Sequence, residues 1–446
     1  MRSFKALFVV LAQCLLAHAA LAAETLDTII IDTGYDKQTR IAVVPFERGP
    51  EFVAQEEMAD VIGFDLSRSG QFAPLERDNM LSFPSRPDQM IFRDWRVLGM
   101  EYVLIGSLRT LTNGNTQVRY YLFDVINQRQ MLSDEVSGTR NEWRDMAHHV
   151  SDDVFEAITG IRGAFSTKIL YVLAQGSGSP GARYSLEMAD SDGERSRTLY
   201  ASDQPIMSPS WGPGGRRAAF VTWQDRRQNI VIIDVQTGTS EVFTNFSGIN
   251  GSPVFSPDGR SLVMVLSQDG NPEIYIMSMS DRGLRRLTRH HAIDTEPSFS
   301  PDGRYVIFTS DRGGSPQIYR LELATNLTER LTFQGDYNAR ARLLPDGKHL
   351  VYVHRRGGRD GNYYIAWQDL ERDDVRVLTQ TSVGLDESPS LAPNGTMLMY
   401  ATQDQGRGIL AVVSIDGRVK YRLPSSSGDV REPAWSPYLD RYPQDS

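Results

Sequence analysis

The side chains with which this chain could do chemistry are few and scattered. His290 and His291 are adjacent and precede Asp294 by a few residues, but their spacing matches no recognised metal-ligand pattern. His148 and His149 are neighbours in a helical pattern, so they cannot share a helix face. The segment Gly176–Gly181 matches G-x-G-x-x-G, but it precedes a strand pattern instead of opening a helix, so we interpret it as a loop.

Nucleophilic chemistry is equally poorly supported. The sequence has no G-x-S-x-G motif. This excludes an α/β-hydrolase domain, which carries its nucleophilic serine in that motif. Its single cysteine, Cys14, lies in an apolar N-terminal run, and Gln13 before it is larger than the small residue that precedes a bacterial lipid anchor. The rest of the chain has neither thiol nor disulfide. We therefore predict no catalytic residue, no cofactor and no metal, and a function in binding.

A repeat of six copies organises most of the chain. Ser-Pro-Asp-Gly occurs at Ser256–Gly259 and Ser300–Gly303, 44 residues apart, and degenerate copies continue the series. Its turn prolines are Pro213, Pro257, Pro301, Pro345, Pro393 and Pro437. Short runs rich in Val, Ile, Tyr and Phe fill each period, and a period in the forties of this kind is typical of a β-propeller with one blade per repeat. The sequence predicts a propeller of six blades, from residue 166 to 446.

The two ends of the repeat are incomplete. The first run, Lys168–Leu173, follows no Pro-Asp-Gly turn, so we interpret it as the second strand of a blade. The last run, Glu432–Ser436, is an innermost strand with no strand after it. We predict that these two runs pair in one blade and close the ring, which leaves no open strand edge.

The innermost strands place a ring of residues at the mouth of the central channel. The position five residues before each turn proline gives one residue per blade: Ser208, Ser252, Glu296, Arg340, Ser388 and Glu432. Just before these positions lie Met207, Asn250, Asp294, Thr295, Asp386 and Glu387. Carboxylates, amides and hydroxyls suit a polypeptide segment or a cation, although any solvated propeller mouth is polar. From these residues we select Met207, Asn250, Thr295, Glu296, Asp386, Glu387 and Glu432 as candidate partner-binding residues.

Residues 23–165 lie outside the repeat and predict a compact α/β domain. Ile41–Phe46 and Tyr102–Leu108 have strand patterns, and Glu56–Ser69 has a helical pattern closed by Gly70. A second apolar helix face runs from Trp143 to Ile161, with Asn141 as the expected N-cap. The predicted fold is therefore an α/β N-terminal domain plus an all-β six-bladed propeller.

The first 22 residues predict a secretory signal. A short basic start is followed by the apolar run Ala6–Leu16 and by the small residues Ala20-Leu21-Ala22, a pattern too short for a transmembrane helix. The net charge of −9 disfavours nucleic acid and anionic lipid as partners. We expect an exported monomer without direct membrane insertion.

Several motifs together resemble one family. They are Arg68–Phe72, the junction Thr159–Phe165, the segment Leu391–Met397 and the terminal Trp435–Leu439. Combined with the signal and the six blades, they resemble TolB, the family of periplasmic propeller proteins of the bacterial Tol–Pal system. The resemblance covers the whole chain after the signal.

The resemblance implies a protein without catalysis that binds two partners. Members of the family bind the peptidoglycan-associated lipoprotein (Pal) at the channel mouth and TolA through the mature N-terminal segment, and support outer-membrane integrity and invagination during cell division. Carried onto this sequence, the Pal-facing motifs are Asn250-Gly251 and Thr295-Glu296-Pro297, and the mobile segment is residues 23–34. Within that segment we select Ile29, Ile30, Ile31 and Asp32 as partner-binding residues. The alternative is a secreted propeller enzyme, of lyase or glycosidase type, with a site at the channel mouth.

Overall fold

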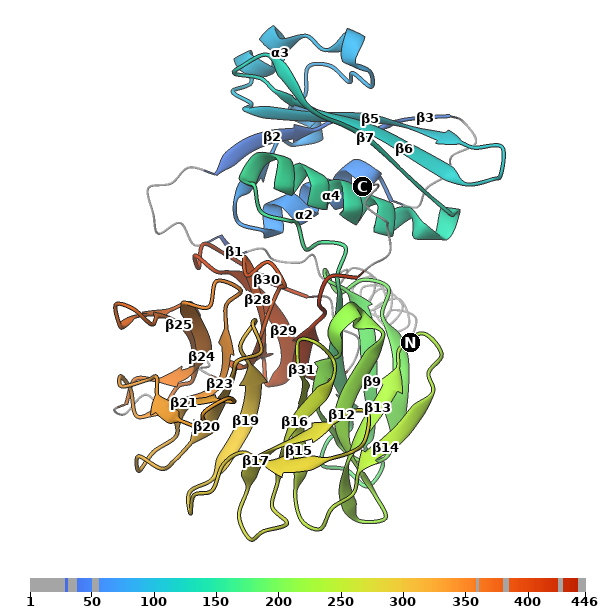
Figure 1. Cartoon of the computed structure of the whole chain (residues 1–446). Coiled ribbons are helices and arrows are strands. Elements are labelled where there is room, and N and C mark those ends of the chain that lie inside the picture. The colour runs from blue at the N-terminus through green and yellow to red at the C-terminus, as the bar shows by residue number, and fades with distance from the viewer. Residues whose placement is uncertain are drawn as a thin grey trace, which may run out of the picture.

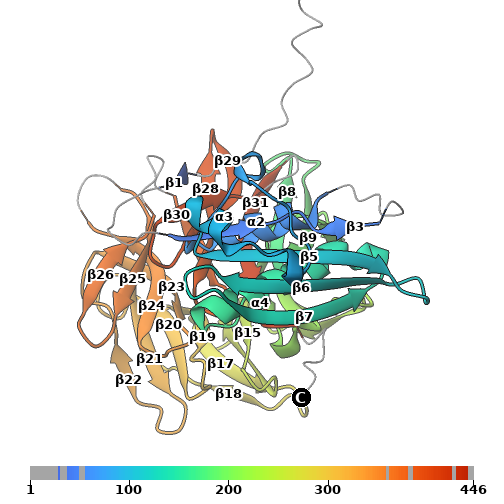
Figure 2. The same cartoon turned by 90° about the horizontal axis from the view of Figure 1, so that it is seen from above.

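The computed structural model describes residues 29–30, 38–49, 56–357, 361–379, 385–423 and 428–439. Two parts are stacked, an α/β part over one face of a β-propeller (Figure 1), and the view from above shows the α/β part lying across the ring (Figure 2). The predicted signal, residues 1–22, and the candidate residues Ile31 and Asp32 lie outside the described residues.

The propeller has the six predicted blades, each an antiparallel sheet of four propeller strands. In five of them the chain runs outward from the channel in sequence order. These strands are β11 (Ile206–Trp211), β12 (Arg217–Gln224), β13 (Arg227–Asp234), β14 (Ser240–Thr244), β15 (Asn250–Phe255), β16 (Ser261–Leu266), β17 (Glu273–Ser278), β18 (Leu284–Arg286), β19 (Asp294–Phe299), β20 (Tyr305–Ser310), β21 (Gln317–Glu322), β22 (Thr328–Arg330), β23 (Tyr337–Leu343), β24 (His349–Arg355), β25 (Tyr364–Asp369), β26 (Asp374–Val377), β27 (Glu387–Leu391), β28 (Met397–Asp404), β29 (Arg407–Ser414) and β30 (Val419–Arg422).

The sixth blade is built from both ends of the propeller sequence. Its strand order is β10-β9-β8-β31, with β8 at Lys168–Gln175, β9 at Arg183–Asp190, β10 at Arg197–Ser202 and β31 at Asp429–Trp435. Trp435 lies opposite Ile169, and its buried indole Nε1 donates to Thr167 Oγ1 at 2.7 Å. The predicted pairing of the last run with the first is confirmed, and it joins the ends of the ring without a disulfide.

Every innermost strand carries the same irregularity. Its ladder with the second strand shifts register at the channel-mouth position, and the residue there has a φ between 46° and 56°. The six residues are Ser208, Ser252, Glu296, Arg340, Ser388 and Glu432. Five of them are followed by proline, which has no N–H to donate to a ladder and is tolerated where a bulge interrupts the pairing.

The α/β part is one mixed sheet with its two longer helices on the side of the propeller. The sheet order is β4-β2-β5-β6-β7, and β3 pairs with β5. Its elements are β2 (Thr39–Val43), β3 (Glu47–Arg48), α2 (Met58–Arg68), β4 (Phe72–Pro74), α3 (Phe92–Val97), β5 (Tyr102–Thr110), β6 (Thr116–Asp124), β7 (Arg129–Gly138) and α4 (Trp143–Thr159). The predicted cap Asn141 is wrong, because Thr139 and Glu142 form the capping box of a 3₁₀ turn that leads into α4.

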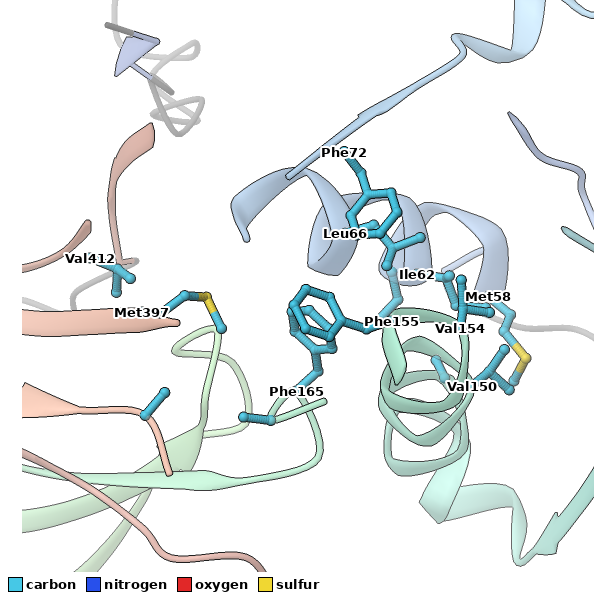
Figure 3. Close-up of a cluster of buried hydrophobic side chains, with 14 of the residues drawn as sticks. Met58, Ile62, Leu66, Phe72, Val150, Val154, Phe155, Phe165, Met397 and Val412 are labelled. Carbon is cyan, nitrogen blue, oxygen red and sulfur yellow. The ribbon is translucent and has the colours of Figure 1, made fainter. Parts of the chain in front are cut away.

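The two parts share a hydrophobic core. Leu66 and Phe155, from α2 and α4, belong to the same buried cluster as Met397 and Val412 of the propeller, and Phe165 lies between them (Figure 3). The rings of Phe155 and Phe165 meet edge to face, with centroids 5.6 Å apart. Burial of large side chains at this joint stabilises the stacked arrangement.

Candidate functional site

The channel mouth lies on the propeller face turned away from the α/β part. The Pro-Asp-Gly-type turns are on the near face, where Asn394 Nδ2 donates to the carbonyl of Arg162 at 3.0 Å. Because each innermost strand ends at such a turn, each begins at the opposite face. The described residues of the loops that join successive blades therefore lie around the mouth, on the face opposite the α/β part (Figure 1).

The six predicted ring residues do converge on one cavity. A cavity of about 70 Å³ is lined by these six residues, which are Ser208, Ser252, Glu296, Arg340, Ser388 and Glu432. Residues one or two positions further along the same strands complete its lining. Arg340 Nε bonds Glu296 Oε1 at 2.7 Å, and a guanidinium nitrogen of Arg340 bonds the hydroxyl of Ser388. Thr309 Oγ1 also donates to Glu296, at 3.0 Å. Glu296 and Arg340 are thus held in a fixed pair across neighbouring blades.

Glu432 lies on the blade opposite Glu296, and it accepts a hydrogen bond from the backbone N–H of Ser208. Burial raises the pKa of Glu432, and this effect outweighs the attraction of Arg340 and the Ser208 bond; Glu387 and Glu296 raise it further. An incoming cation or hydrogen-bond donor at the mouth would favour the charged form of this carboxyl.

Several candidate residues hold loops instead of facing solvent. Asn250 is fully buried, where its side chain accepts from the N–H of Phe246 and donates to the carbonyls of Phe246 and Gly248. Asp386 is equally buried and accepts from Thr402 Oγ1 at 2.7 Å. Both side chains fix the loops that shape the mouth, so any direct contact with a partner would come from their neighbours.

The other candidates in this region are accessible. Glu387 is exposed, and Met207, Thr295, Glu296 and Glu432 are half-buried. They lie on innermost strands of four different blades, so a ligand that contacts all of them must cover the mouth.

The sequence analysis missed an apolar rim around this polar centre. Ile249, Ile293, Phe333 and Leu385 lie in four of the loops that join successive blades, and each is 39–63% exposed. Three of them directly precede an Asn or Asp that lies at the start of an innermost strand or one residue before it, a periodic signal that was visible in the sequence. Exposed apolar side chains around a polar centre are a feature of protein interfaces.

The N-terminal segment adds a strand to the propeller. β1 (Ile29–Ile30) pairs antiparallel with β30, where Ile29 lies opposite Lys420 and Ile30 opposite Val419. It is the fifth strand of the blade β27–β30, added at the outer edge. The candidate residues Ile29 and Ile30 therefore lie on the outer edge of a blade, far from the channel mouth.

His290 and His291 stack at a ring-centroid distance of 4.2 Å. The Nδ1 of His290 accepts from the N–H of Ala292, and both carboxylate oxygens of nearby Asp294 accept from Arg312. The His290 ring nitrogen and the Asp294 carboxylate are therefore already used in hydrogen bonds that stabilise this region.

A buried ionic cluster joins the two parts of the molecule, and the sequence analysis did not find it. His148 of α4 contacts Asp65 of α2 at 2.7 Å and approaches the carboxylates of Asp190 and Asp192, on the propeller side, at 3.7 and 3.6 Å. Burial lowers the pKa of His148, but these carboxylates outweigh it and raise the pKa to about 10. His148 is therefore a buried imidazolium at neutral pH.

Arginine side chains complete the cluster. Arg68, fully buried, bonds Asp65, the carbonyl and hydroxyl of Ser191 and the hydroxyl of Tyr421. Arg144 bonds Asp192. Asp65, His148 and Asp192 have the residue types of a metal site, but the arginines already neutralise the carboxylates. The arrangement is an interdomain ion network.

Comparisons with known proteins decide the family. A model of the TolB amino-terminal domain matches residues 27–131, and a model of the TolB beta propeller domain matches residues 155–439. The Tol-Pal system protein TolB of Pseudomonas putida is 57% identical over 427 residues, which cover 96% of this chain and 97% of that protein. The chain belongs to the TolB family.

Further relatives agree with this assignment. The same protein of Pseudomonas aeruginosa is 55% identical over 95% of this chain and 98% of its own. The crystal structure of TolB from Acinetobacter baumannii superposes with a TM-score of 0.84, at 42% identity, over 93% of this chain and 100% of that chain. The predicted resemblance and the predicted fold class are both confirmed.

Membership of the TolB family decides between the two predicted kinds of function, a binding protein and an enzyme. TolB is a non-catalytic component of the Tol–Pal system, so this chain is not an enzyme, and the alternative of a secreted lyase or glycosidase is excluded. Its ligands within the system are other proteins. In the part of the chain that the structure describes, no helix is both long and apolar enough to cross a membrane.

Proposed function

We propose that this protein acts in the periplasm, where it binds Pal at the channel mouth and TolA through its N-terminal segment. In this role it supports outer-membrane integrity and the inward movement of that membrane during division. The observation that carries the proposal is the mouth itself, a fixed Glu296–Arg340 pair inside a rim of exposed apolar side chains, on the face that the α/β part leaves open.

The composition of the mouth suits a folded protein partner. The apolar rim offers area that a partner buries, and the polar centre offers groups that fix its orientation. Within this surface, Thr295, Glu296, Glu387 and Glu432 make direct contacts, whereas Asn250 and Asp386 shape the loops. Met207, which also lies at the channel mouth, supplies an apolar contact.

Two substitutions at the mouth should weaken Pal binding. Phe333→Ser removes an apolar side chain of the rim, and Glu296→Arg places a second cation beside Arg340. We expect Glu296→Arg, at the centre, to weaken the binding free energy by about 2–4 kcal/mol, and Phe333→Ser, at the rim, to weaken it by about 1 kcal/mol. Isothermal titration calorimetry with the soluble domain of Pal measures the effect.

The matched control is Val97→Ser, because Val97 is equally apolar and 76% exposed but lies on α3, away from the mouth. It should bind Pal like the unchanged protein. Equal affinity of Phe333→Ser, Glu296→Arg and Val97→Ser would show that Pal does not bind here. Recovery of Pal in a pull-down from periplasmic extract tests the partner itself.

The N-terminal segment is proposed to be the TolA site. A segment that pairs with β30 through its backbone can leave that edge and add to another sheet, because strand addition needs only free N–H and C=O groups. Pal binding would be coupled to this exchange if Pal has different affinities for the two states of the segment.

Deletion of residues 23–34 should abolish TolA binding and spare Pal binding, because the two sites share no residue; the affinity for Pal should change only by the coupling between the two sites. Hydrogen exchange over residues 25–32 should change when Pal binds. Pull-down with TolA and exchange measured with and without saturating Pal are the two measurements. Identical exchange in both states would mean that the sites are independent.

A further inference from the structure

A second ring of residues lies on the innermost strands, two positions beyond the mouth residues. Its members are Ser210, Val254, Ser298, Arg342, Ser390 and Ala434. Ser210, Val254 and Arg342 line the same cavity as the mouth residues. Arg342 is the one charged member of this ring, and the hydroxyls and small apolar groups around it carry no negative charge.

Arg342 lacks a carboxylate partner. Its Nη1 donates to the carbonyl of Ala341 at 2.9 Å, and no carboxylate forms an ion pair with it among the residues that the structure describes. Burial and the neighbouring charge of Arg340 lower the pKa of Arg342 to about 10, against the attraction of Glu296. The guanidinium is still protonated at neutral pH, so a cation with several unused donors faces the channel.

The nearest carboxylates are already bonded to other groups. Glu296 bonds Arg340 through both its oxygens, and Glu432 accepts from the N–H of Ser208. On the blade directly opposite Arg342, the buried Oγ of Ser210 has no hydrogen-bond partner in the described part of the chain. Arg342, a cation with unused donors, and Ser210, whose hydroxyl is unbonded, thus both line one small cavity.

We infer that the channel is an anion site that binds a carboxylate at Arg342. A guanidinium donates two parallel hydrogen bonds to a carboxylate, and Ser210 lines the opposite wall of the same cavity. A cavity of about 70 Å³ holds a few waters or one such group. The carboxylate has two sources, a free small anion or an Asp or Glu side chain of a protein docked at the mouth; the second source rests on the proposed function.

The first experiment tests the site with formate. The protein is labelled with ¹⁵N-arginine, and the Nε–H signal of Arg342 is assigned by its loss in Arg342→Gln. Formate is titrated at constant ionic strength against chloride, a spherical anion that cannot make paired bonds. We expect that signal to shift saturably, and Arg342→Lys to lower formate affinity about tenfold, because a single ammonium cannot match the bidentate geometry. Arg93→Gln, which alters an exposed arginine of α3, should leave the titration unchanged.

The second experiment identifies the source. If a docked protein supplies the carboxylate, formate should compete with the soluble domain of Pal. Arg342→Gln should then weaken Pal binding about 10- to 100-fold, and one Asp→Asn or Glu→Gln change in Pal should lose its effect in that background. Formate binding without competition would assign the site to a free anion.

The outcomes are distinguishable from a failure of the proposed function. A protein that binds formate at Arg342 but does not bind Pal would refute the proposed partner and keep the anion site. An Arg342 signal that formate does not move, together with Pal affinity unchanged by Arg342→Gln, would overturn the inference. Melting curves of Arg342→Gln and Arg342→Lys verify that both variants are folded.

Discussion

Removal of residues 430–446 is expected to lower the melting temperature by about 10–20 °C and to promote aggregation. The change deletes all of β31 except Asp429, and with it the buried Trp435 and its bond to Thr167. Loss of a buried tryptophan alone typically destabilises by about 3–5 kcal/mol, and the deletion also uncovers the channel-side edge of β8. Differential scanning calorimetry and light scattering measure both effects.

The matched control is a truncation after Leu439, which keeps all of β31 and the buried Trp435. It should melt like the full-length protein. If the two truncated proteins melted within a degree or two of each other and both stayed monomeric, β31 would not hold the ring together. In the full-length protein and in the control, which both keep Trp435, its fluorescence gives an independent readout of ring opening during unfolding, because the indole is buried while the blade is closed.

Substitution of His148 in the ionic cluster between the two parts should strongly lower the stability of the protein. His148→Gln removes the buried cation that Asp65, Asp190 and Asp192 share, so we expect a loss of about 3–5 kcal/mol in the free energy of unfolding. The loss arises because the carboxylates stay buried with too few partners. Urea unfolding at pH 6 measures it.

The pH dependence follows from the raised pKa of His148. The folded-state pKa is about 10, above the unfolded value of about 6.5, so the folded protein holds the proton more tightly. The contribution to stability is complete below pH 6.5 and is lost as the pH rises towards 10. We expect the difference between the unchanged protein and His148→Gln to shrink over this range.

The control for both measurements is His149→Gln, since His149 is the next residue and is about a quarter exposed. It should change stability by less than about 1 kcal/mol. A His148→Gln variant as stable as His149→Gln, or a difference that did not change with pH, would mean that His148 does not carry the charge assigned to it.

The sequence predicted most of the fold because turn chemistry repeats. Pro-Asp-Gly or a degenerate copy with the same proline marks one corner of each blade, so the spacing of Pro213 to Pro437 predicted the number of blades and the phase of the strands. The phase in turn predicted the pairing of β31 with β8 and the six residues at the mouth. These features depend on local signals repeated six times.

Features that depend on contacts between distant residues were not predictable. Asp65, His148 and Asp192 come from three separate elements, and nothing in their local sequence indicates that they meet. The bulge at each mouth residue was also missed, although five of the six precede proline. The wrong cap at Asn141 has a local cause, since Thr139 and Glu142 compete for the same turn.

The pairing of β31 with β8 also determines when folding can finish. The two strands are separated by the whole of the other five blades, so the ring cannot close until Trp435 is available. Contacts of such high sequence separation make folding slow, and until then the edge of β8 is unpaired. A nascent chain would therefore remain an open string of blades until its last strand is added. The channel would then be assembled only after the last strand of the chain has been synthesised.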